Sequence, residues 1–206
     1  MAFNWNWLGI VVWLLVVLIV IGLILDVRRR HLKRIMSQKE QPTLGNVFLD
    51  IAEFLVALAV VLGMFYVTFL DHVDVKDTNQ IRLSYEVKPL VMQTQATQGF
   101  YVQARESKDK DMVQYYKYWT EGAKYSVPGN NASISESTQP TTLNAKNYPW
   151  PDTKKYDKKY QKAYVITMVA RYRNNWRNGL GINAGSVATD YTLIRVPSDT
   201  FVKIVK

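Results

Sequence analysis

The sequence contains no cysteine and only two histidines, His31 and His72, among its 206 residues. Disulfides, thiol nucleophiles and thiolate metal sites are therefore excluded, and the catalytic sets that need histidine lack members. Neither a G-x-x-x-x-G-K-[ST] loop nor a G-x-G-x-x-G fingerprint occurs. These absences predict a protein that is not an enzyme and that needs no metal and no cofactor. A small envelope enzyme that uses carboxylates alone is left open, although no spacing marks such a pair.

Charge is also missing from the first 25 residues, and the uninterrupted apolar run 8–25 would cross about 27 Å as a helix. A dense basic cluster follows it. Because Lys and Arg stay on the cytoplasmic side during insertion, the cluster predicts a span whose N-terminus, residues 1–7, lies outside. A signal peptide has its positive charge before the apolar run, so we expect this span to remain uncleaved. The residues expected to set the orientation are Arg28, Arg29, Arg30, Lys33 and Arg34.

A second apolar run, 47–70, predicts a return span after a basic cytoplasmic loop, 26–46. Asp50 and Glu53 lie in its first turns, where we expect them to reach water or to meet the basic cluster rather than to form a transport site. Small residues at helical spacing mark one side of this span as a candidate packing face. The simplest partner is the first span, through Gly9 or Gly22, and another membrane protein is the alternative. The packing face comprises Ala52, Val56, Ala59 and Gly63.

After a linker, 71–80, the hydrophobic pattern changes to period two, which predicts a mainly antiparallel β domain over 81–206 outside the cytoplasm, with one short helix near 154–162. A central strand is expected at 164–172 because it is apolar on both faces. Polar, glycine-containing stretches at 128–140 and 174–186 predict surface loops. Strands are expected at 81–87, 99–105 and 112–119, with a hairpin from the last of these to 123–127 and a terminal hairpin of 191–196 with 201–205.

The domain after residue 71 combines aromatic rings with lysines, and the net charge of the chain is +9. Aromatic faces stack on sugars, and Lys pairs with phosphate or carboxylate, so the stretch 150–164 is a candidate contact for an anionic wall polymer or another glycopolymer. The alternative is that the rings fill a small core and the lysines keep the domain soluble. Nucleic acid is not expected, given the exterior location. The candidate residues are Trp150, Lys154, Lys155, Tyr156, Lys158, Lys159, Tyr160 and Lys162.

The order of these parts resembles an uncharacterised family of two-span envelope membrane proteins from lactic-acid bacteria. The resemblance rests on the Trp-flanked first span, Asn4-Trp5-Asn6-Trp7-Leu8-Gly9, the basic turn, the return span and the Tyr/Lys-rich β domain. It implies a location in the cell membrane and no activity or site residues. The leading functional hypothesis is a membrane-tethered binding or scaffolding module of the cell envelope, which contacts an anionic wall polymer or a neighbouring envelope protein. The alternative is an accessory subunit of a transporter or envelope enzyme that docks through the second span.

Overall fold

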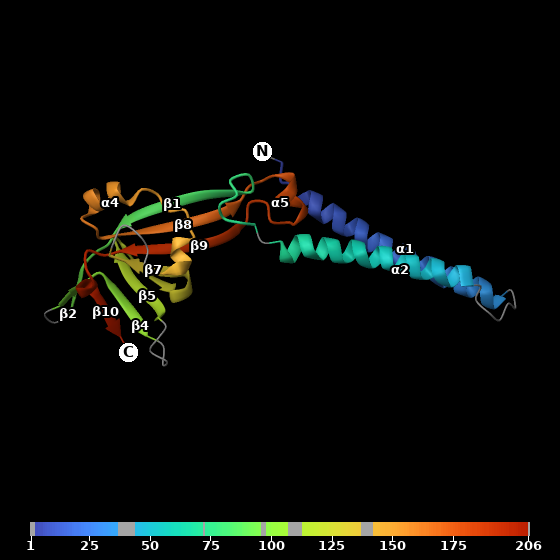
Figure 1. Cartoon of the computed structure of the whole chain (residues 1–206), viewed down its shortest axis with the longest axis horizontal. Coiled ribbons are helices and arrows are strands. Elements are labelled where there is room, and N and C mark those ends of the chain that lie inside the picture. The colour runs from blue at the N-terminus through green and yellow to red at the C-terminus, as the bar shows by residue number, and fades with distance from the viewer. Residues whose placement is uncertain are drawn as a thin grey trace. The chain divides into compact units, whose positions relative to one another are not determined.

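The computed structural model describes residues 3–36, 44–71, 73–95, 98–106, 113–136 and 142–205. The chain divides into two compact units, one built on long helices and the other on β-strands (Figure 1). The first unit comprises Met1–Val73 and Tyr172–Ser186, and the second comprises Asp74–Arg171 and Val187–Lys206. His72, the start of the strand expected at 112 and the end of the loop expected at 128–140 lie outside the described residues.

Two apolar helices form most of the first unit. Helix α1 covers Asn6–Met36, and α2 covers Leu44–Phe65 before continuing as a π-helical turn, Tyr66–Leu70. They lie side by side and run in opposite directions (Figure 1). Both are long and apolar enough to cross a bilayer. α1 is longer than the predicted 8–25 because the start of the basic segment continues the helix up to Met36 instead of forming a loop.

A charged cluster fixes the rotation of α2 against α1. Arg30 on α1 pairs with Asp26 at 2.8 Å, with Asp50 of α2 at 3.1 Å, and with Glu53 of α2 through a charge-assisted hydrogen bond. The predicted meeting of the acidic pair with the basic cluster is therefore confirmed. Near the opposite end of the hairpin, the Trp13 indole N–H donates to the Thr68 hydroxyl at 3.1 Å.

The predicted packing of the small residues of α2 against the first span is wrong. Ala52, Val56, Ala59 and Gly63 are all exposed, and among the described residues no atom beyond the surrounding turns of α2 lies within 4 Å of where a Gly63 Cβ would be. The ion pairs of Arg30 turn the Asp50 and Glu53 side of α2 toward α1, so the small residues point elsewhere. A Cβ on Gly22 would likewise meet no described atom within 4 Å outside the surrounding turns of α1, and Gly9 approaches a different segment.

That segment is 172–186, which includes the predicted surface loop 174–186 and folds against the N-terminal end of α1. It contains a short helix, α5 (Trp176–Leu180), beside the start of α1 (Figure 1). The Asn174 side chain accepts from the Trp5 amide at 3.1 Å and donates to the Phe3 carbonyl at 2.7 Å. The Asn6 side chain in turn makes a reciprocal pair of bonds with the backbone of Ala184, at 2.9 and 3.0 Å.

The second unit holds two four-stranded sheets, ordered β1-β8-β9-β7 and β10-β4-β5-β6, and a small β2-β3 pair. β8 is central, and β5 and β6 form a hairpin around Gly122, whose φ is +81°; both features were predicted. The strands are β1 (Ile81–Pro89), β2 (Gln93–Gln95), β3 (Gln98–Phe100), β4 (Val102–Glu106), β5 (Val113–Thr120), β6 (Ala123–Pro128), β7 (Ala132–Ser135), β8 (Tyr164–Tyr172), β9 (Val187–Arg195) and β10 (Val202–Val205). Helices α3 (Leu143–Lys146) and α4 (Thr153–Tyr160) and 3-10 turns at Gly129–Asn131 and Asp199–Phe201 complete the unit.

Antiparallel pairing predominates among the described strands, as predicted, but the domain is mixed because two pairings are parallel. β10 pairs with β4 in parallel, with Val202 opposite Val102, and so does not form the predicted terminal hairpin with β9. β7 also pairs with β9 in parallel and lies inside the stretch predicted as a surface loop, with Ser133 and Ser135 fully buried. The strand was not predicted because its two serines give the sequence little of the apolar, β-branched pattern that is typical of strands.

The central strands bury side chains on both faces. Val165 of β8 and Ile194 of β9 join Val102 and Tyr118 of the other sheet in one core cluster. On the opposite face, Tyr164, Ile166 and Leu193 form another cluster, against which Tyr156 and Tyr160 of α4 pack. This arrangement places α4 over the outer face of the sheet and makes it the element on which the predicted site residues gather.

Candidate functional site on helix α4

Helix α4 is short and is defined by specific caps. The Asp152 side chain accepts from the Lys154 amide at 3.1 Å, which satisfies one free N–H of the first turn. The helix ends where Gln161 and Lys162 adopt left-handed backbone angles, with φ of 50° and 63°. An isolated helix of this length is not stable in water, so contacts with the sheet must hold it.

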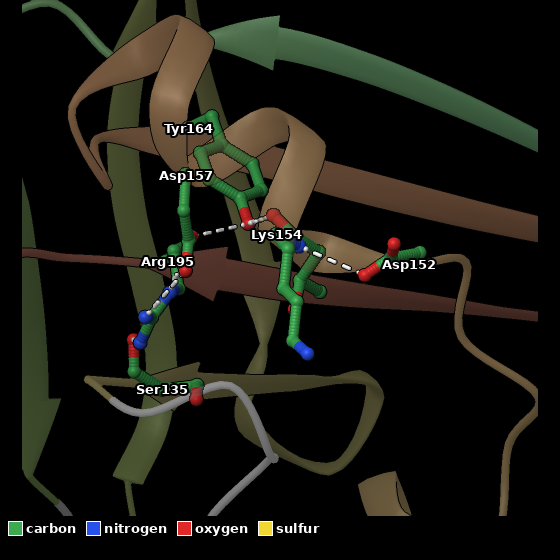
Figure 2. Close-up of polar contacts among 7 residues, drawn as sticks. Ser135, Asp152, Lys154, Asp157, Tyr164 and Arg195 are labelled. Atoms are coloured by element: carbon green, nitrogen blue, oxygen red, sulfur yellow. Dashed lines mark hydrogen bonds and ion pairs between the residues drawn. The ribbon is translucent and has the colours of Figure 1, made fainter.

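An ion pair with a buried guanidinium fastens α4 to the sheet. Arg195 of β9 is only 2% exposed, and its Nε and Nη2 atoms donate to the two carboxylate oxygens of Asp157, both at 3.0 Å. The third nitrogen donates to the Ser135 carbonyl of β7 at 3.3 Å. Figure 2 shows the guanidinium between Asp157 and Ser135. One side chain thus joins a helix and two strands.

Tyr164 completes this network. Its hydroxyl lies 2.8 Å from an Asp157 carboxylate oxygen and 3.3 Å from the Thr153 carbonyl (Figure 2). Hydrogen bonding from Arg195 lowers the pKa of Asp157 below its ordinary value, with a smaller contribution from Tyr164. Burial, followed by the bond to Asp157, raises the pKa of the Tyr164 hydroxyl. The carboxylate is therefore held charged and the phenol neutral, which is the state in which the network is fully bonded.

The aromatic part of the predicted site belongs to the core. The Tyr156 and Tyr160 rings each lie 5.9 Å from the Tyr164 ring. The indole N–H of Trp150 donates to the Ala145 carbonyl at 2.6 Å, and its ring meets Tyr191 edge-on at 6.1 Å. These three rings are half-buried, which agrees with the alternative prediction that the rings fill a small core. They do not form an open stacking surface beside the lysines.

The basic part of the predicted site lies on the surface. Lysines at positions one turn apart form two neighbouring rows on α4, and one more follows its end. Like charges at this spacing repel and weaken a helix, so the lysine face does not contribute to the stability of α4. The capping by Asp152 and the ion pair of Asp157 offset that cost. The exposed residues, called here the lysine face, are Lys154, Lys155, Lys158, Lys159 and Lys162.

Sequence reasoning missed Arg195 and Asp157. A signal was present, because Arg195 follows the apolar pair Leu193-Ile194 at the end of its strand, and a charged residue is almost never buried without a partner. Nothing in the sequence identified Asp157 among the other carboxylates as that partner. Of the residues expected to set orientation, Arg28, Arg29 and Lys33 are exposed, Arg30 pairs with α2, and the side chain of Arg34 lies outside the described residues. Within the described residues, no group of three or more His, Cys, Asp or Glu side chains is placed to hold a metal ion.

These features define a class of protein: a hairpin of two long apolar helices followed by a mixed β-rich domain with a basic surface helix. The model of one uncharacterised protein family matches residues 4–203, and the chain belongs to that family. The match extends over the helices and the β domain alike. Neither the curated proteins nor the solved structures contain a significant match to the chain.

Proposed function

We propose that the protein is a membrane-tethered binding module of the cell envelope. In this proposal α1 and α2 cross the cell membrane, the turn between them lies in the cytoplasm, and residues 71–206 lie outside. Only 11% and 6% of the two apolar windows are buried within the structure, which is unlike the core helices of a soluble protein. The contacts of the 172–186 loop with Phe3, Trp5 and Asn6 support a first helix that stays attached after export, since cleavage would remove the partners of that loop.

Reporter fusions test this orientation. A fusion after Met36 is expected to give the signal of a cytoplasmic reporter, and a fusion after Lys206 the signal of an exported one. The physical reason is the basic segment after the first span, which is retained inside during insertion. An exported-type signal at Met36, or a cytoplasmic one at Lys206, would overturn the topology.

The observation that carries the binding role is the lysine face of α4. Four of its five lysines are exposed on one helix held to the sheet and the fifth just after it, although the mutual repulsion of the charges weakens the helix. Such a surface attracts a polyanion through many weak contacts at once. An anionic wall polymer, with phosphates or carboxylates repeated along its chain, is the ligand class that fits an exterior domain of this charge.

A second candidate role rests on α2. Ala52, Val56, Ala59 and Gly63 are exposed and are not used by α1. In lipid, small residues allow another helix to approach closely. The protein would then be an accessory subunit of a transporter or envelope enzyme, bound through this packing face.

One crosslinking experiment distinguishes the two roles. Full-length protein is crosslinked in native membranes at low and high salt and then recovered. We expect wall polymer to be recovered at low salt and to be lost in about 1 M salt, where the Debye length is about 3 Å. The affinity for the polymer, and with it the recovery, is expected to fall by up to about 1000-fold in a variant with four neutralised lysines, because each cation near an anionic surface contributes about 1 kcal/mol and every 1.4 kcal/mol is a factor of ten. The substitutions are Lys154→Gln, Lys155→Gln, Lys158→Gln and Lys159→Gln.

A matched control variant loses the same charge elsewhere on the β unit, at exposed cations outside α4. Its polymer recovery is expected to stay close to that of the parent. If the control and the α4 variant lose polymer equally, binding through the lysine face is contradicted. Recovery of one integral membrane protein at both salts, lost in Ala59→Leu and Gly63→Leu, would favour the accessory subunit instead. The control substitutions are Lys76→Gln, Arg82→Gln, Lys124→Gln and Lys146→Gln.

A further inference from the structure

The 172–186 loop contacts the ends of both apolar helices. A Cβ on Gly9 would lie 2.5 Å from the Gly179 carbonyl oxygen, and a Cβ on Gly181 would lie 2.9 Å from the Val67 carbonyl oxygen. The loop therefore touches α1 one turn after its start and touches the π-helical turn that ends α2. At 1.5 Å per residue, Asn6 to Gly9 corresponds to about 5 Å along α1, similar to the depth of one head-group layer.

The outward side of this loop is aromatic and basic. Trp176 is 58% exposed, and it belongs to the same unit as Trp7, which is 60% exposed. Arg173 and Arg177 are exposed as well, three residues before and one residue after Trp176 in the sequence. In water, the exposed apolar surface of these two indole rings would be unfavourable in free energy. In a head-group layer, the amphipathic indole is favoured and a guanidinium binds phosphate with paired N–H groups.

The loop is also held in place without Trp176. Asn175 caps α5 by accepting from the Asn178 amide at 2.9 Å, and the buried Asn178 side chain donates to the Arg173 carbonyl at 2.9 Å. Within the described residues, the Trp176 indole makes no hydrogen bond or ring contact, and its exposure leaves it available to a partner outside the chain. The position of the loop at the helix ends indicates which partner that is.

We propose that the 172–186 loop is a membrane-surface contact of the chain in addition to its two apolar helices. Trp176 lies among the phospholipid head groups at the level of Trp7, and Arg173 and Arg177 bind lipid phosphates of the same leaflet. The inference rests on the proposed insertion of α1 and α2, because only then does the loop lie at a bilayer surface. As a consequence, the chain is attached to the membrane surface at the 172–186 loop as well as at the end of α2.

Site-directed fluorescence tests the proposal on the full chain, which has no cysteine of its own. Trp176→Cys, labelled with an environment-sensitive fluorophore, is placed in phosphatidylcholine–phosphatidylglycerol vesicles that carry nitroxides at the head group or in the acyl chain. Quenching is expected to place the label about 15–22 Å from the bilayer centre, the depth of the head groups. Trp7→Cys is expected at the same depth, and Leu18→Cys near the centre.

The three labels separate the failure of this proposal from the failure of membrane insertion. A deep label at Leu18 with no lipid quenching at Trp176 would overturn the loop contact and leave insertion intact. A label at Leu18 that escapes lipid quenching would overturn insertion and the loop contact together. Arg173→Gln with Arg177→Gln is expected to weaken quenching at Trp176 when phosphatidylglycerol is present. Equal quenching in that variant and in the control Lys124→Gln with Lys146→Gln would overturn the assigned role of the arginines.

Discussion

Replacing Arg195 with methionine is expected to lower the free energy of unfolding of the β-rich unit by about 3–5 kcal/mol. The substitution keeps most of the buried side-chain volume but leaves the Asp157 carboxylate, 13% exposed, without its guanidinium. It also removes the donor to the Ser135 carbonyl. Because domains are stable by only about 5–15 kcal/mol, this loss is large. Denaturant unfolding of full-length protein in detergent, followed by near-UV circular dichroism, measures it.

Two variants control this result. Arg171→Met removes an exposed arginine from the neighbouring strand, and its effect is expected to stay within about 0.5 kcal/mol. The double variant with Asp157→Asn is expected to be more stable than Arg195→Met alone, because no unpaired charge is then buried. Equal losses in Arg195→Met and Arg171→Met would contradict the role assigned to the ion pair.

The same ion pair makes the stability of the folded protein fall as the pH falls. Arg195 lowers the pKa of Asp157 in the folded protein, so the unfolded chain takes up a proton on this group first as the pH falls. The stabilisation is complete above the ordinary Asp pKa of about 4 and is lost as pH falls through the lower folded value. Asp157→Asn is therefore expected to flatten the stability profile below pH about 4, relative to the parent.

The elements that can be predicted from this sequence are those with a local cause. The long apolar runs give α1 and α2, the alternation around Glu121-Gly122 gives the β5–β6 hairpin, and the doubly apolar stretch at 164–172 gives the central strand. Asp50 and Glu53 were expected near the basic cluster, because a hairpin places the start of the second helix beside the end of the first. Arg30 of that cluster pairs with both carboxylates.

The features that were missed depend on contacts between distant segments. Parallel pairing of β10 with β4 joins Val202 to Val102, and no local pattern specifies that choice over a hairpin. The tyrosines and lysines of α4 are interleaved in sequence, and helical periodicity then separates them into a core face and a surface face. The 172–186 loop has the composition of an ordinary surface loop, and its contact with α1 depends on glycines whose importance appears only in three dimensions.

The close approach of the loop to α1 at Gly179 can be tested by substitution. Gly179→Ala is expected to release the 172–186 loop from α1, because the added Cβ would lie 2.3 Å from the Trp5 carbonyl oxygen. The obstacle is backbone, so a rotamer change cannot relieve it and the loop must move. Overpacking of this kind costs about 1–3 kcal/mol, which corresponds to about 5–150-fold faster exchange of the amides that the contact protects. Hydrogen exchange at the Trp5 and Ala184 amides measures the release.

A matched pair of variants decides whether this contact behaves as the structure requires. Gly22→Ala makes the same chemical change on α1, where a Cβ meets no described atom within 4 Å outside the surrounding helical turns, and it is expected to leave loop exchange unaltered. Gly9→Ala places its Cβ 2.5 Å from the Gly179 carbonyl oxygen, so it should release the same contact from the other side. The combined Gly9→Ala and Gly179→Ala variant should then exchange little faster than either alone, because the contact can be lost only once. Unchanged exchange in Gly179→Ala, or effects that add fully in the combined variant, would show that the loop is not held through this close approach.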